Sequence, residues 1–396
     1  MAPFDHSSID FKVLRERAYN FRWADMPEDI IPLTTADSDF PIAPELVRGL
    51  TEAVSTGYMP YVPPRGYPEV RQSIARQLNR RKNEHVDPEL LLPIDSASTG
   101  MHVIARTFLQ PGDEAVIFDP VDYIFYSSVT AAGAKAVRFP ARLTADNRID
   151  LSGLESSITP RTRMIGLCNP HNPLGTVFPA EDLQLILDLA EKYDLYIINN
   201  EVWSDIVYPP KKFTSILSLR PESNRRVLSV YGFSKGFSIA GLRSGCIYAG
   251  DGEMFERLVN TSSVMSTAGG VSCLSQTAAK ICMDECYGWN AAFVEHLRGN
   301  RDYAVERIGK MPGIVTNVPD ATFMLFPDIT ATGLSSDALR EYLLREGLAI
   351  ISGSEYFGPR GEGHIRICLA TSREILQEAM DRLERALVKL AQSRNI

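Results

Sequence analysis

Short apolar runs alternate with amphipathic segments through most of the chain. Runs rich in β-branched and other apolar residues predict strands at 91–95, 114–119, 136–139, 163–168, 195–200 and 226–231. Segments with apolar residues three and four positions apart predict helices at 43–54, 68–82, 99–109, 123–132 and 180–193. Strands that alternate with helices are typical of an α/β domain built around a largely parallel sheet.

The pattern changes in the last third of the chain. Residues 252–310 are expected to be mainly helical, and residues 336–346 form a further helix. Strands are expected at 321–326 and 364–369. An apolar stripe near the C-terminus predicts a long final helix, and Thr371 and Glu374 have the spacing of a capping box at its start.

The 396 residues suit one large domain with a smaller one attached. We expect an N-terminal arm with part of the small domain at 1–48, a large domain at 49–285 and a small α+β domain at 286–396. The arm carries four aromatic residues, which suggests that it lies on another surface, such as that of a partner subunit. These residues are Phe11, Tyr19, Phe21 and Trp23.

Composition and charge exclude several classes of function. The net charge of −8 and the lack of a basic patch argue against nucleic-acid binding. No apolar run approaches the length of a membrane span, and the N-terminus does not read as a signal peptide. The six cysteines include no C-x-x-C pair and the histidines are scattered, so we expect reduced thiols in a cytoplasmic protein and no metal site.

One lysine stands out against this background. The strand at 226–231 leads into a turn of small residues that contains Lys235, and Arg243 follows. A buried ammonium is costly, and burial lowers its pKa, so a neutral amine there could form a Schiff base with an aldehyde. Arg243 would lower that pKa further and could hold a phosphate. On these residues alone, an ordinary lysine in a surface loop is an equal alternative.

Other polar segments follow neighbouring strands. Residues 169–176 and 200–203 come directly after two predicted strands, as Lys235 does after a third. Because ligands of parallel sheets bind at the carboxyl ends of the strands, these segments should lie at one edge. Thr99 and Gly100 open a predicted helix, where free backbone N–H groups could approach a phosphate. This convergence favours the catalytic interpretation of Lys235.

Three motifs in the right order carry a resemblance to a known family. Residues 169–175 read NPHNPLG and look like an N-P-x-N-P-x-G signature, and Ser234, Lys235 and Arg243 look like S-K-x(7)-R. Residues 66–71 read GYPEVR, after Tyr61, and look like a G-x-x-x-L-R element. On these motifs nearly the whole chain resembles the class I/II aminotransferase superfamily of fold-type I pyridoxal 5′-phosphate enzymes.

The resemblance implies a large domain with a mostly parallel seven-stranded sheet and a smaller α+β domain. Within the superfamily, residues 36–40 and 205–208 look most like the cystathionine β-lyase-type C–S lyases. The family forms homodimers, and the resemblance implies that Tyr61 reaches the neighbouring subunit's site as a catalytic and cofactor-binding residue. A packed loop aromatic is the alternative for Tyr61.

The resemblance also assigns roles within one site. Lys235 would carry the cofactor as a Schiff base and then move the substrate's α-proton. Asn172 would hydrogen-bond the 3′-oxygen of the pyridoxal ring and border the substrate. Arg366, with the backbone near Ala36, would bind the substrate carboxylate, although a surface arginine is the alternative. The phosphate would be held by Arg243, Ser234 and the helix start at Thr99, Gly100 and Met101.

The ring environment departs from the family pattern. Asn200 occupies the place of an aspartate that keeps the pyridine nitrogen protonated. Its neutral amide cannot do so by charge, although it could donate a hydrogen bond to an unprotonated ring nitrogen. Trp203 occupies the place of a tyrosine or histidine. The ring-stacking aromatic is displaced by one position, so either Tyr123 stacks or Asp122 lies near the ring. Gly232 replaces a common phosphate-binding serine.

These departures lead to three hypotheses. The first is C–S β-elimination from an amino acid or S-substituted cysteine conjugate. The departure of a good leaving group requires less stabilisation of negative charge by the pyridine ring, which suits Asn200. The alternative is an aminotransferase, or a decarboxylating or O₂-dependent oxidative deaminase of specialised metabolism. A second alternative is a non-catalytic protein that binds the cofactor. The sequence does not predict the side chain of the substrate.

Overall fold

The computed structural model describes residues 4–220, 225–266 and 269–394. Its centre is a seven-stranded sheet in the order β2-β8-β7-β6-β5-β3-β4. Only β8 runs antiparallel to its neighbours. The strands are β2 (Leu91–Ile94), β3 (Glu114–Asp119), β4 (Lys135–Pro140), β5 (Thr162–Cys168), β6 (Tyr196–Asn200), β7 (Val227–Gly232) and β8 (Gly245–Ala249). The predicted mostly parallel, seven-stranded sheet is confirmed.

Helices cover both faces of this sheet because its strands are apolar on both sides. One helix, α4, contacts β6, β7 and β8 and packs beside α5 and α8. The helices of this part are α2 (Pro44–Ser55), α3 (Pro68–Lys82), α4 (Ala97–Phe108), α5 (Tyr123–Ala131), α6 (Ala180–Lys192), the single turn α7 (Phe233–Gly236), α8 (Gly252–Ser262) and α9 (Cys273–Glu285).

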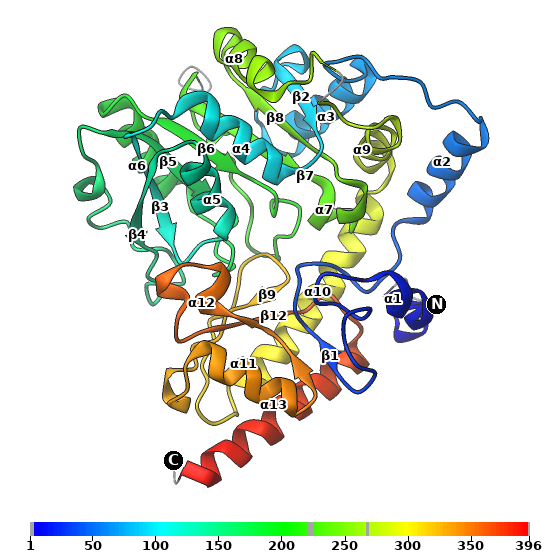
Figure 1. The fold of residues 1–396 in the computed structure, drawn as a ribbon, viewed down its shortest axis with the longest axis vertical. Helices are drawn as coiled ribbons and strands as arrows, with labels where there is room; N and C mark the ends of the chain where they lie inside the picture. The colour runs from blue at the N-terminus through cyan, green and yellow to red at the C-terminus, as the bar shows by residue number, and fades with distance from the viewer. Residues whose placement is uncertain (1–3, 221–224, 267–268, 395–396) are drawn as a thin grey trace.

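A second group of elements lies below the large sheet in Figure 1. It contains a three-stranded antiparallel sheet of β9 (Met324–Leu325), β11 (Ile351–Ser352) and β12 (Ile365–Cys368). The helices are α1 (Phe11–Arg17), α10 (Tyr287–Ile308), α11 (Ser336–Arg345), the turn α12 (Gly353–Tyr356) and α13 (Arg373–Arg394). The N-terminal arm joins this group, because β1 (Ile31–Pro32) pairs in parallel with β10 (Leu348–Ala349).

Three local predictions need correction. The strand expected at 321–326 is reduced to Met324–Leu325, because only these residues pair with β12. The final helix is capped by Ser372, whose hydroxyl accepts from the Ile375 N–H, and not by Thr371. The helix expected from Thr99 begins at Ala97, because the Ser96 hydroxyl accepts from the Thr99 N–H and caps it.

Helix α4 thus packs on β6 and β7, and the second group of elements lies on the lower side of the large sheet (Figure 1). Among the described residues, no helix is both long and apolar enough to cross a bilayer. The same residues contain no group of three or more side chains arranged to hold a metal ion.

Candidate active site

A cavity of about 290 Å³ lies at the carboxyl ends of β5, β6 and β7. It brings together residues that the motifs place far apart in the sequence, as expected for a ligand site of a parallel sheet. The predicted residues that line it are Ala36, Tyr123, Asn172, Asn200, Trp203, Ser234, Lys235 and Arg243.

Lys235 lies in the short helix α7, directly after β7. Its ammonium nitrogen donates to the backbone oxygen of Ala36 at 2.6 Å and lies 5.8 Å from the centre of the Trp203 ring. Burial lowers the pKa of Lys235, although the charges of Asp37 and Asp122 act in the opposite direction. The side chain is therefore poised to lose its proton and act as a nucleophile or base.

One end of the cavity is suited to a phosphate. Arg243 lines it and has no carboxylate partner among the described residues. Ala97 and Ser98, in the first turn of α4, also line the cavity, and helix geometry leaves their backbone N–H groups without an intrahelical partner. Arg243, this helix start and Ser234 are therefore the candidate phosphate donors of the cavity.

The predicted contribution of the helix start shifts along the chain. The Thr99 N–H donates to the Ser96 side chain, and the Gly100 N–H donates to the Ser96 backbone oxygen. Met101 is fully buried. These three residues do not line the cavity, because the helix begins before them and their N–H groups are already used or turned inward. Gly100 instead gives room for packing, since a Cβ there would lie 2.7 Å from Ile247.

Asn172 and Asp122 form a coupled pair on one wall. The Asn172 amide donates to the Asp122 carboxylate at 2.8 Å, and the Asp122 backbone N–H donates to the Asn172 backbone oxygen at 3.1 Å. The Asn172 Oδ1 is buried without a partner among the described residues. Asn172 therefore keeps one amide hydrogen and one oxygen for a ligand.

Asn200 ends β6 and faces the same cavity. Its Oδ1 accepts from the Val202 N–H at 3.1 Å, which leaves its amide nitrogen as the group available to a ligand. Trp203 lines the cavity and makes an edge-to-face contact with Phe323, with ring centres 4.8 Å apart. This wall therefore offers neutral donors and no carboxylate.

Gly232 is fixed by close packing. A Cβ at this position would lie 2.5 Å from a methyl carbon of Val202 and 3.1 Å from the Cβ of Ala97. A serine, which is common at this place in the family, does not fit this backbone. Ser98, which lines the cavity, supplies a hydroxyl from the opposite segment.

A second cavity of about 230 Å³ adjoins the first, since Asn20, Ala36, Asp122 and Tyr123 line both. Arg366, on β12, lines the second cavity and donates to the backbone oxygen of Thr34 at 3.1 Å. Its Nε is buried without a partner among the described residues, and burial lowers the pKa of the guanidinium. A buried, incompletely satisfied arginine is suited to a carboxylate ligand.

Tyr61 lies apart from both cavities and is 91% exposed. A role in a neighbouring subunit stays a prediction. Tyr123 lines both cavities, but it is 54% exposed and makes an edge contact with Tyr356, with ring centres 6.2 Å apart. Asp122 caps α5 beside it, so both residues that the sequence left open border the site.

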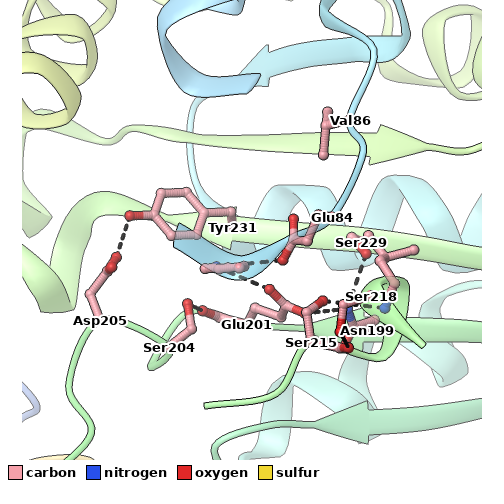
Figure 2. Close-up of polar contacts among 12 residues, drawn as sticks. Glu84, Val86, Asn199, Glu201, Ser204, Asp205, Ser215, Ser218, Ser229 and Tyr231 are labelled. Carbon is pink, nitrogen blue, oxygen red and sulfur yellow. Dashed lines mark hydrogen bonds and ion pairs between the residues drawn. The ribbon is translucent and has the colours of Figure 1, made fainter. Parts of the chain in front are cut away.

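Glu201, the residue after Asn200, does not line the cavity and lies in a buried polar cluster with Asn199, Ser215 and Glu84 (Figure 2). The Glu201 carboxylate accepts from Lys82 at 3.0 Å, Asn199 at 2.9 Å and Ser215 at 2.8 Å. Glu84 points toward the same lysine, and burial followed by the charge of Glu201 raises its pKa. We refer to these side chains as the Lys82 cluster; it fixes the end of β6 from behind.

Sequence reasoning missed several cavity residues. Ser96, Ala97 and Ser98 were signalled by a serine three positions before Thr99, which is the usual spacing of a helix cap. Asn20 carries no sequence signal, and Phe21 was noted only as an aromatic residue of the arm, because only the fold of the arm brings them to the cavities.

Comparison with known proteins decides the family. A model of the family "Aminotransferase class I and II" matches residues 28–383. The chain belongs to this family. The aspartate aminotransferase of Pyrococcus abyssi is 33% identical over 366 residues, which cover 91% of this chain and 92% of the relative. The cofactor is pyridoxal 5′-phosphate, as for the family.

Solved structures agree on the fold. An aromatic aminotransferase from Pyrococcus horikoshii superposes with a TM-score of 0.85 at 30% identity, covering 92% of this chain and 98% of that one. A provisionally named β-cystathionase from Corynebacterium diphtheriae gives 0.88 at 26% identity, covering 97% and 99%. Both reaction types therefore occur among the structural neighbours, while the names of the sequence relatives favour the aminotransferase alternative over the C–S lyase.

The residues present fit the cofactor. The cavity is lined by an arginine without a carboxylate partner, by the start of helix α4, and by Asn172 with an unpartnered buried oxygen. Lys235 lines the same cavity and has a lowered pKa. These residues offer candidate donors for a phosphate, polar amides for a ring and an amine for an aldehyde.

Proposed function

We propose that this protein transfers the amino group of an α-amino acid to a 2-oxo acid with pyridoxal 5′-phosphate as cofactor. One observation carries the proposal: Lys235 is withdrawn from water, with a lowered pKa, in a cavity that continues to the unpaired guanidinium of Arg366. The aminotransferase names of the sequence relatives support the same reaction.

The bound cofactor would supply an aldehyde that accepts amines and a ring that withdraws electrons. Arg243, Ser234 and the first turn of α4 would hold its phosphate, and Asn172 and Asn200 would hydrogen-bond its ring. Arg366 would fix the substrate carboxylate and so present the α-proton to Lys235. The ε-amine of Lys235 would then take that proton from the α-carbon.

The groups beside Lys235 cannot themselves move the α-proton of a substrate. Trp203 and the Ala36 backbone flank Lys235, and neither can take up a proton at neutral pH. Lys235 is therefore the one group of this wall that can move the α-proton.

We propose in addition that the unit is a homodimer, with Tyr61 of each chain completing the partner's site.

C–S β-elimination is the second candidate. Asn200 favours it, because the pyridine ring stabilises negative charge less well when its nitrogen pairs with a neutral amide than when it pairs with an aspartate. Loss of a β-thiolate from an S-substituted cysteine needs less of this charge stabilisation than reversible amino transfer does.

The test is to give the purified, cofactor-loaded protein a panel of amino acids with and without pyruvate or 2-oxoglutarate. Formation of a new amino acid only when the 2-oxo acid is present would support amino transfer. Release of pyruvate and thiol from S-alkyl cysteines without a 2-oxo acid would instead support the lyase. Peroxide or CO₂ would indicate oxidation, and a bound cofactor without turnover would contradict both candidates.

A further inference from the structure

The second cavity is lined by Arg366, which the proposed function assigns to the substrate carboxylate, so its other lining residues would lie beside the bound substrate. It adjoins the cofactor cavity and is closed by residues of the N-terminal arm, of α5 and of the turn after β11. We call it the side-chain cavity. Its chemistry should therefore select among amino acids, an inference that rests on the proposed function.

Aromatic rings form much of its wall. Phe21 and Tyr123 line it although they are 51% and 54% exposed, and Tyr356 meets Tyr123 edge to face. Phe357 lies beneath the Arg366 guanidinium at 5.1 Å. Exposed aromatic faces around a cavity gain most from a flat apolar ligand, which removes them from water and stacks on them.

The arm adopts a rare conformation to place two of these residues. Asn20 and Phe21 are consecutive and have φ angles of 67° and 62°. Such angles are uncommon for residues other than glycine and strained for a bulky side chain. The conformation is held from outside: Thr35 and Thr34 donate to the backbone oxygens of Asn20 and Phe21, respectively.

A buried ion pair reinforces this conformation. Arg22 pairs with Asp39 and also donates to the backbone oxygens of Thr35 and Asp37. Trp23 donates to the same Asp39 carboxylate at 2.6 Å. Strain that the surroundings enforce is common at ligand sites, and here its result is that Asn20 and Phe21 border the cavities.

The charges of the side-chain cavity are also selective. Among its lining residues Arg366 is the one cation and Asp122 the one carboxylate. The α-carboxylate of a substrate would use Arg366. A second carboxylate on the side chain would then meet Asp122 and no cation of this chain, so dicarboxylic substrates would be repelled.

We infer that the enzyme selects amino acids with a neutral aromatic side chain, which Phe21, Tyr123 and Tyr356 grip, and that Asp122 excludes dicarboxylic substrates. The strained pair Asn20–Phe21 acts as the specificity element. This assignment differs from the dicarboxylic substrate that the name of the Pyrococcus abyssi relative carries.

Carboxylates that lack an amino group test this directly, because they can occupy the site without reacting. Calorimetry would measure binding of 3-phenylpropanoate, hexanoate and succinate to the cofactor-loaded protein. We expect 3-phenylpropanoate to bind about tenfold more tightly than the other two. Equal or tighter binding of succinate would overturn the charge argument, and equal binding of hexanoate would overturn the aromatic one.

Variants of the N-terminal arm test whether Phe21 contributes to the binding of the aromatic analogue. Phe21→Ala should weaken 3-phenylpropanoate binding about tenfold, while Phe21→Tyr should retain it. Tyr19→Ala is the matched control, because it removes a 64% exposed ring from the same arm outside both cavities. If Phe21→Ala and Tyr19→Ala bound the analogue equally, the arm would have no role in specificity. Unchanged cofactor absorption and melting temperature would show that the variants fold.

Asp122→Asn provides an independent measurement. It removes the charge and keeps an oxygen for Asn172, so succinate binding should rise several-fold while 3-phenylpropanoate binding changes little. No gain for succinate would refute the role of Asp122. Selective binding of the aromatic analogue without amino transfer would refute the proposed reaction alone; efficient transfer from aspartate would refute the specificity alone.

Discussion

Two lysines lie on opposite sides of the end of β6, and their surroundings differ. Lys82 lies among Glu201, Glu84 and the ring of Tyr231 (Figure 2 shows these three residues), and Lys235 lines the cofactor cavity. Burial alone would lower the pKa of Lys82, but the charges of Glu201, Glu84 and Asp205 together raise it. The pKa of Lys235 is lowered, because burial prevails over more distant charges.

The difference separates a structural lysine from a reactive one. Lys82 is held as a cation, because its loss of a proton would leave Glu201 buried without its partner. Lys235 has a backbone carbonyl and no carboxylate in hydrogen-bond contact, so its neutral form is accessible. Desolvation is common to both residues, and the nearest partner decides what each lysine can do.

The largest expected effect is the loss of cofactor attachment when Lys235 is replaced. Lys235→Met should abolish covalent attachment of the cofactor, since no other side chain that lines the cavity is a primary amine. Visible absorption, and mass spectrometry after borohydride reduction, would measure this. A covalent adduct in the variant, or absorption like that of the wild type, would remove Lys235 from its assigned role.

Removing the charge of Lys82 should instead lower the free energy of unfolding. Lys82→Met would leave Glu201 and Glu84 buried without their cation, at a cost of about 3–5 kcal/mol in the free energy of unfolding. Urea unfolding of the cofactor-free protein would measure it. Lys310→Met is the control, because that lysine forms an exposed i,i+4 pair with Glu306 and should change nothing measurable. Equal stability of both variants would mean that the Lys82 cluster is dispensable.

The pH dependence of stability should separate the two lysines. The pKa of Lys235 falls on folding from 10.5, so between its lowered folded value and 10.5 the unfolded chain binds the extra proton. Cofactor-free wild type should therefore gain stability relative to Lys235→Met as the pH rises toward 10.5. Lys82 behaves oppositely: its contribution is complete below 10.5 and is lost only as the pH rises through its raised value.

Urea unfolding at several pH values between neutrality and 10.5 would test this. Because the Lys82 charge lowers the pKa of Glu84 and Glu201, Lys82→Met should lose stability relative to wild type as the pH rises, until both buried carboxyls are ionised. Absence of any pH-dependent gain of wild type over Lys235→Met would refute the lowered pKa of Lys235.

The smallest expected effect on stability comes from Asn200→Asp. The new carboxylate would face the cavity, so the unfolding free energy of the loaded protein should change by about 1 kcal/mol or less. Pairing with the ring nitrogen should instead shift the cofactor absorption and speed exchange of the substrate α-proton. Unchanged spectra and exchange would show that Asn200 does not contact the ring.

Asn199→Asp is the matched control, because it is the same substitution one residue earlier, on the other side of the strand. Asn199 donates to Glu201 and to Ser229, so a carboxylate there would repel Glu201 inside the Lys82 cluster. It should cost about 2–4 kcal/mol and leave the cofactor absorption of the folded protein unchanged.

Much of the fold and part of the site were predictable from the sequence. The apolar runs indicated most strands of the large sheet, and the strand ends at Asn169, Asn200 and Lys235 indicated one edge. No strand was predicted at Gly245–Ala249, so β8 was missed altogether, and its antiparallel direction is a tertiary property that an apolar run does not show. The helix start at Ala97 and the cap at Ser372 were missed by one or more residues, as local sequence signals leave such boundaries uncertain.

By itself, the sequence determined the α/β class, the family motifs, and the pairing of Lys235 with Arg243 as candidate chemistry, because periodicity and spacing are local properties. Only the tertiary structure decided which N–H groups of α4 are free, that Gly232 has no room for a side chain, and that Lys82 is paired while Lys235 is not. It also brought Phe21 to Arg366. These are consequences of burial and of contacts between distant segments, and burial with its partners, not residue type, sets the chemistry of a charged group.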